Sequence, residues 1–184
     1  MLRLVPVAAA LAAMFASPAL AEELSGENLL ASLPPPFELG WKTQQDNLEM
    51  FEYVPHGEKV EDWSRLITIQ VFHGKPGADG SGVGSKMAEI WEKACNNGSG
   101  AEATSGTENG YGFAVWSYDC PLNPESNKPE TMFLKAMIGV DALYVVQYAY
   151  RAEADEDMVT EAITYLKTVG VCDTRVPEQA CPAQ

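Results

Sequence analysis

The strongest constraint on the fold comes from two apolar segments in the second half of the chain. They span Thr131 to Ile138 and Leu143 to Tyr150, and a short turn joins them. Both alternating faces of each segment are mostly apolar, so we expect a buried β-hairpin that is covered on both sides. The register around Gly139 to Ala142 is left open by the sequence. A membrane hairpin is disfavoured because the arms are short and polar residues interrupt them, namely Lys135, Asp141 and Gln147.

Two helices are predicted by apolar residues that repeat at the same helical spacing. The positions i, i+4, i+7, i+8 and i+11 form one stripe on a helix surface. The first stripe is Val83, Met87, Ile90, Trp91 and Ala94, and the second is Met158, Ala162, Tyr165, Leu166 and Val169. Each stripe needs an apolar surface to cover, which a sheet face can provide.

The remaining strands are predicted by alternation and by turn residues between them. Leu66 to His73 gives the clearest β-branched alternation, and the others are expected at 37–42, 48–54, 101–105 and 111–119. Short connections imply a mostly antiparallel sheet of about six to seven strands. We therefore predict a single α+β domain over residues 37–170. Its expected architecture is an α/β/α sandwich with one helix on each face.

A glycine-rich loop, HGKPGADGSGVGSK, links a predicted strand to the first predicted helix. This order resembles a phosphate-binding loop, but both nucleotide motifs fail. Lys86 follows Ser85 instead of preceding it, and the third glycine of GxGxxG is absent. We therefore expect the glycines to serve a sharp turn between sheet and helix, with Ser81 or Ser85 capping the helix.

The first 21 residues have the pattern of a cleaved export signal. Arg3 precedes an apolar run that is too short to span a membrane, and small residues precede Glu22. We expect a periplasmic or secreted protein without stable membrane insertion. Residues 22–36 are expected to form an N-terminal arm with a helical turn at 27–32 and a proline-rich link.

The chain is strongly acidic. It has 12 basic and 26 acidic side chains, a net charge of −14, and removal of Arg3 with the signal leaves −15. Such a charge repels nucleic acids and anionic lipid surfaces, and it disfavours phosphate ligands. We therefore predict no nucleic-acid partner.

Four cysteines in an exported chain favour two disulfides. Three pairings are open. We favour Cys95 with Cys120 and Cys172 with Cys181, because each pair encloses one local segment of the chain. A metal site is disfavoured because there is no CxxC pattern. We expect residues 171–184 to form a tail that its own disulfide holds, with Gly170 capping the second helix.

The sequence offers little catalytic chemistry. It contains two histidines and no GxSxG motif, and the cysteines are better explained by disulfides. Alternating acids at Glu153, Asp155 and Asp157 lack the rest of a calcium loop, so they are better explained by a helix start. We therefore expect no enzyme activity, no cofactor and no metal.

Aromatic residues suggest two kinds of binding surface. Tyr144, Tyr148 and Tyr150 share one strand face, which could hold a sugar or an apolar ligand; the alternative is that the rings pack beneath a helix. Trp63 lies in a charged connection, Glu61 to Arg65, where it is either an exposed anchor for a partner or a plug at the sheet edge. The plug is favoured.

The element order over residues 37–170 resembles the PsbP-like sandwich, shared by an extrinsic photosystem II protein and small bacterial exported proteins. The stretch KPETMFLKAMIGVDALYVVQYAYR, residues 128–151, is similar to a recurrent segment of small exported proteobacterial proteins. The resemblance implies an assembly or accessory role. We therefore expect a non-enzymatic periplasmic protein that binds another periplasmic or envelope protein, with small-ligand binding as the alternative.

Overall fold

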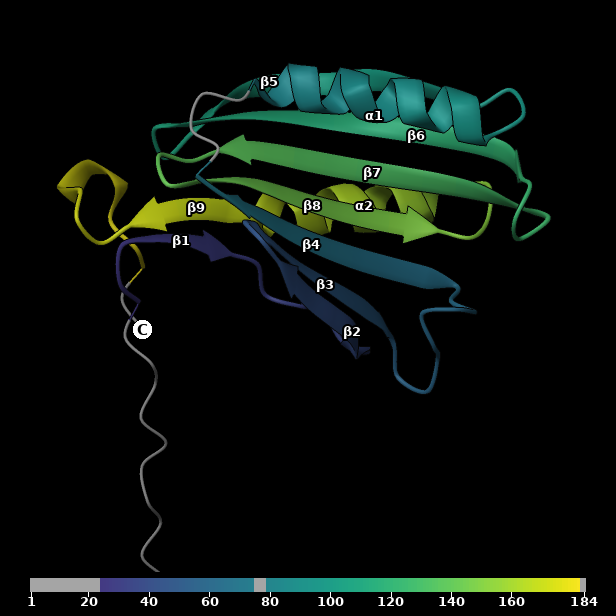
Figure 1. Cartoon of the computed structure of the whole chain (residues 1–184), viewed down its shortest axis with the longest axis horizontal. Helices are drawn as coiled ribbons and strands as arrows, with labels where there is room; N and C mark the ends of the chain where they lie inside the picture. The colour runs from purple at the N-terminus through teal and green to yellow at the C-terminus, as the bar shows by residue number, and fades with distance from the viewer. Residues whose placement is uncertain (1–23, 75–78, 183–184) are drawn as a thin grey trace, which may run out of the picture.

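A computed structural model describes residues 24–74 and 79–182 of the chain (Figure 1). The predicted signal at residues 1–21 therefore lies outside the described residues, as does part of the glycine-rich loop. The elements are β1 (Glu27–Leu30), β2 (Phe37–Gln45), β3 (Leu48–Pro55), β4 (Arg65–His73), α1 (Gly80–Ala94), β5 (Ser99–Glu108), β6 (Tyr111–Asn123), β7 (Lys128–Ile138), β8 (Ala142–Tyr150), α2 (Glu156–Thr168), β9 (Gly170–Asp173) and a short 3₁₀ helix, η1 (Pro177–Gln179).

Seven strands form one antiparallel sheet in the order β2-β3-β4-β8-β7-β6-β5. This confirms the predicted α+β class and the mostly antiparallel sheet. The turn between β7 and β8 pairs Ile138 with Leu143, which fixes the register that the sequence left open. Tyr144 then lies opposite Met137, and Tyr148 lies opposite Phe133.

Strand β8 contributes to two separate apolar clusters. Its even-numbered residues, such as Tyr144 and Tyr148, pack with Ala162, Tyr165 and Leu166 of α2. Leu143, Val145 and Ala149 of β8 belong to a second cluster, which also contains Ala88 of α1, Leu134 of β7 and Tyr118 of β6. Successive residues of a strand point to opposite faces, so β8 is buried from both sides.

Helix α1 packs on β5, β6 and β7 through small residues. Gly80, Gly84 and Ala88 are its buried positions, and a Cβ added at Gly84 would overlap the indole of Trp116. The Tyr118 hydroxyl donates to the Gly84 carbonyl oxygen at 2.9 Å. The predicted stripe is therefore not the centre of the contact, because Val83 and Met87 lie at its flank and Ile90 is exposed.

Both ends of α1 are fixed. The predicted serine caps are wrong: Asp79 is the N-cap, and its side chain accepts from the Ser81 backbone N–H. The aspartate is preferred because its carboxylate satisfies a free N–H and complements the helix dipole. At the other end, Cys95 pairs with Cys120 of β6, as the sequence predicted.

Helix α2 is held by a buried lysine that the sequence analysis treated only as an interruption. Lys135 of β7 is 1% exposed, and its Nζ donates to the Leu166 and Val169 carbonyl oxygens and to Glu108. These carbonyls lie at the C-terminal end of α2, where the Leu166 oxygen also accepts from the Val169 backbone N–H, and the ammonium opposes the negative end of the helix dipole. Asp155 caps the other end of α2.

The first and the last strand of the described residues, β1 and β9, pair with each other, which the sequence did not predict (Figure 1). Residues 27–30 form β1 and not the predicted helical turn, because their backbone pairs with β9. Gly170 starts β9, and Val169 is the C-cap of α2. The predicted tail disulfide between Cys172 and Cys181 is present.

Side chains fasten this terminal pair to the turn between β7 and β8. Glu27 accepts hydrogen bonds from the backbone N–H groups of Val140, Asp141 and Ala142 and from the Tyr144 hydroxyl. Arg175 binds Asp173 and Asp141. Charge-assisted bonds of this kind are stronger than neutral ones, so they fasten β1 and β9 to the main sheet.

The long turn predicted between residues 120 and 129 is shorter than expected. Strand β6 continues to Asn123 and β7 begins at Lys128. A bulge between Cys120 and Asn123 contains Pro121, which cannot donate a ladder hydrogen bond. The bulge thus lets β6 continue past Pro121, a residue of the turn that the sequence predicted.

We predict that Lys135→Met lowers the free energy of unfolding by about 3 kcal/mol, because the Val169 carbonyl oxygen loses its donor, the Leu166 carbonyl oxygen keeps only the Val169 N–H, and Glu108 loses its cation. Chemical denaturation measures this change. The matched control is Lys86→Met, which removes an exposed pair with Glu89 and should cost less than about 0.5 kcal/mol. Equal stability of the two variants would contradict the role given to Lys135.

Candidate functional site

The face of the sheet that carries α1 is only partly covered. Because α1 lies over β5, β6 and β7, a groove runs between the helix and strands β4 and β8. We call it the α1 groove; its volume is about 430 Å³. Its lining residues are Val83, Met87 and Ile90 of α1, Phe72, Leu143 and Val145 of the strands, and the more polar Gln70, Asp79, Gly82 and Lys86.

The apolar wall of the groove belongs to the stripe that the sequence predicted to face the sheet. Val83, Met87 and Ile90 follow one flank of the helix, and the Ile90 side chain is 51% exposed. The helix contacts the sheet mainly through its small residues, so Val83 and Met87 are only partly buried against the second apolar cluster and Ile90 is exposed. An exposed apolar flank beside a groove is typical of a binding surface.

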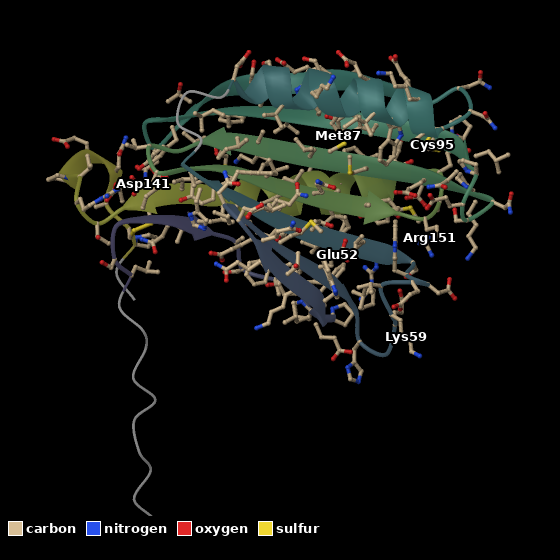
Figure 2. All side chains as sticks on the ribbon, in the orientation of Figure 1. Glu52, Lys59, Met87, Cys95, Asp141 and Arg151 are labelled. Carbon is tan, nitrogen blue, oxygen red and sulfur yellow. A yellow bond between two sulfur atoms is a disulfide. The ribbon has the colours of Figure 1, made fainter. Side chains whose placement is uncertain are left out.

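Beyond the groove, the same face continues across β4, β3 and β2. The register places Trp41 beside Glu52, and Glu52 beside Thr68. The Trp41 side chain is 41% exposed. Figure 2 labels Met87 on the helix side and Glu52 on the strand side of this face.

Side-chain amides connect the floor of the groove to this outer part. Gln147 Nε2 donates to Gln70 Oε1 at 3.2 Å, and Gln70 Nε2 contacts the Met50 sulfur at 3.1 Å. These bonds orient the amides across β8, β4 and β3. Each amide group has further hydrogen-bonding capacity, which an incoming polar group can use.

Glu52 is the one carboxylate of β3 on this face. It is half-buried, and burial raises its pKa above the usual range. Among residues 24–74 and 79–182, no hydrogen bond or ion pair to its side chain is found. A half-buried carboxylate without a partner is electrostatically costly, so this position favours a positively charged group.

A second cavity lies between α2 and strands β5 to β7. Its volume is about 390 Å³, and apolar side chains line much of it, including Phe113, Val115, Ile163 and Leu166. Lys135 and Glu108 lie at its wall, with the Lys135 ammonium 4.9 Å from the centre of the Phe113 ring. All three donors of the ammonium are already used, so it has no free donor for a ligand.

The tyrosines proposed for ligand binding lie in the core. Tyr144 and Tyr148 are 4% and 0% exposed and pack with α2. Their hydroxyls donate to Glu27 and Glu161, at 3.1 and 2.8 Å. Burial, as the largest cause, raises the pKa of both phenols. A ligand could contact these rings only after α2 moved, so the geometry favours the packing alternative.

Trp63, the other predicted binding residue, is 7% exposed and packs in the cluster that contains Val54. The Arg151 guanidinium lies 4.2 Å from the centre of its ring, in a cation–π contact. This geometry is that of the plug at the sheet edge. Participation of Trp63 in partner binding stays a prediction. Trp63 and the two tyrosines therefore lie in different clusters, and none of them lines the α1 groove.

The residues of the groove were overlooked because no local motif marks them. The sequence did identify Val83, Met87 and Ile90 as apolar, but it assigned them to the helix–sheet contact. The missed signal was the second helical row, Gly80, Gly84 and Ala88, whose small side chains allow close packing. That row could have predicted that the larger residues lie at the flank.

A protein-family model matches residues 36–171, well over half of the chain. No curated protein matches the sequence. Within the part of the chain that the structure describes, no helix is long and apolar enough to span a membrane.

We predict that Trp63→Ala lowers the free energy of unfolding by about 3–5 kcal/mol, because it removes a buried indole and leaves a cavity beside Arg151. Trp41→Ala is a matched control that removes an indole from the exposed part of β2, and it should cost about 1 kcal/mol or less. Denaturant unfolding compares the two. If Trp63→Ala were as mild as Trp41→Ala, Trp63 would not be a plug.

Proposed function

We propose that this chain, which belongs to the protein family whose model matches residues 36–171, is a non-enzymatic accessory protein that binds another exported or envelope protein. The observation that carries the proposal is the α1 groove, where a partly exposed apolar flank of the helix borders strands β4 and β8. The partner covers that flank.

The exposure of large apolar side chains supports a macromolecular partner. Ile90 and Trp41 are both on the α1 side of the sheet, one at the groove and one on the outer strand. Leaving them in water is unfavourable, and burial of such residues contributes much of the affinity of protein interfaces. The chain is otherwise acidic, and the acidic surface would speed encounters with a basic partner.

Export to the periplasm, or secretion, is part of this proposal. Two disulfides within a chain of this size are compatible with an oxidising compartment. The arrangement of helices about the sheet supports the α/β/α sandwich that the PsbP-like resemblance implies. That resemblance favours an accessory role over catalysis.

A second candidate function is the binding of a small apolar ligand. The observation in its favour is the cavity of about 390 Å³ beside α2, a volume within the range of small-molecule sites. This cavity replaces the aromatic face as the place for such a ligand, because Tyr144 and Tyr148 lie beneath the helix.

We predict that a photo-crosslinking amino acid at position 90 forms one discrete adduct with an envelope protein in the native cell. The same probe at Val159, which is partly exposed on α2, should form none. Adding Met87→Asp should abolish the adduct at position 90 without unfolding the protein, because a carboxylate in the apolar wall opposes burial. Mass spectrometry of the crosslinked material measures both outcomes.

The outcomes separate the two candidates. An adduct at position 159 and none at position 90 would contradict docking in the α1 groove. If native mass spectra instead show a bound small molecule that Ala103→Trp removes and Ala101→Trp retains, ligand binding beside α2 replaces the first proposal. Ala103 lines that cavity, whereas Ala101 is an exposed residue of the same strand.

A further inference from the structure

The chemistry of the partner can be inferred from Glu52. This residue comes from β3, and the register places it between Trp41 of β2 and Thr68 of β4, on the α1 side of the sheet. Val54, two residues further along β3, is in the cluster that contains Ala88 of α1, which fixes the face. Side chains of the two neighbouring strands therefore flank the carboxylate without neutralising it.

The carboxylate of Glu52 differs from the other acids for which partners are found on neighbouring strands. Glu38 and Glu49 each contact a histidine, and Glu27 accepts from three backbone N–H groups. Glu52 has no partner of either kind within the described residues. Its cross-strand neighbours are the partly exposed Trp41 of β2 and the buried Thr68 of β4.

A carboxylate beside an indole is a favourable site for a cationic side chain. A guanidinium or ammonium group can pair with the carboxylate while its charge or its alkyl stem lies on the ring face. Partial burial strengthens the pairing, because fewer water molecules screen it. The amides of Gln70 and Gln147 lie one strand or two further in and can accept the remaining donors.

The size and openness of the surface favour a chain segment as the source of this cation. The α1 groove and the outer strands are continuous across β8, β4 and β3, and the apolar wall of Met87 and Ile90 borders the groove. An acidic chain also attracts a basic partner at a distance. A single small amine would leave the apolar wall exposed.

We propose that the α1 groove binds a segment of a partner protein in which a lysine or arginine pairs with Glu52 and Trp41, and adjacent apolar side chains cover Met87 and Ile90. This inference rests on the proposed function and specifies the chemistry of the partner. It predicts selectivity for a basic residue with apolar neighbours over an acidic or purely apolar segment.

The test uses the mature chain, residues 22–184, and a displayed library of random peptides. Peptides selected on this protein should be enriched in lysine or arginine beside apolar residues. Glu52→Lys should weaken their binding by about tenfold or more, and selection on that variant should no longer enrich basic residues. Glu178→Lys is the matched control, because it makes the same charge change on η1, which contributes no residue to the groove, and should alter binding less than about twofold.

Two further variants keep the outcome decisive. Trp41→Ala alters an exposed side chain and should weaken the same peptides even if Glu52→Lys folds poorly. Met87→Asp should abolish binding if the peptides occupy the groove. Peptides that require Met87 but are indifferent to Glu52 and Trp41 would overturn the cation inference and leave docking in the groove intact. Peptides indifferent to all three residues would overturn the groove as well.

Discussion

Strand β8 must be shielded from water on both faces, and the rest of the structure follows from this requirement. Eight of its nine residues are buried, and Gln147 is the exception. Its tyrosines pack with α2, and Leu143, Val145 and Ala149 contribute to the cluster of α1. The requirement explains why β8 lies in the interior of the sheet, between β4 and β7.

The two sides meet this requirement in different ways. On the side of α2, the buried ammonium of Lys135 joins the sheet to the C-terminal carbonyls of the helix. On the side of α1, glycines bring the helix backbone close to Trp116 and Ala114, and a disulfide fixes its end to β6. Close packing over β5 and β6 places α1 away from β2 and β3. The open groove is thus a consequence of how the helix is attached.

The close packing of α1 on the sheet also explains glycines of the glycine-rich segment. Gly80 and Gly84 lie in α1 and face the sheet, where a Cβ at Gly84 would overlap Trp116 and one at Gly80 would lie only 3.2 Å from the Ala114 nitrogen. Glycine within a helix costs up to about 1 kcal/mol relative to alanine. The close packing of α1 on the sheet offsets this loss of helix propensity. The features that resembled a phosphate-binding loop therefore have an explanation in helix–sheet packing.

Much of this fold was predictable because its signals are local. Alternation identified the strands of the main sheet, although their ends shifted, and cysteine spacing led to both disulfide pairs. The missed features depend on contacts between distant residues. Strand β1 exists because it pairs with β9, and Lys135 is buried because Glu108 and two helix carbonyls surround it.

The groove was missed for the same reason, since the position of α1 depends on which side of the helix meets Trp116. The family match and the element order leave the PsbP-like relationship a prediction.

The central claim is that Gly84 sets the position of α1, and comparison of Gly84→Ala with Gly82→Ala tests it most directly. Gly82 is exposed, and a Cβ there would meet only the Asp79 side chain, at 3.6 Å. Alanine is the better helix former, so Gly82→Ala should raise the free energy of unfolding by up to about 1 kcal/mol. Gly84→Ala should lower it by at least about 1–3 kcal/mol, because the new methyl group displaces the Trp116 indole. Stabilisation of similar size in both variants would contradict the account.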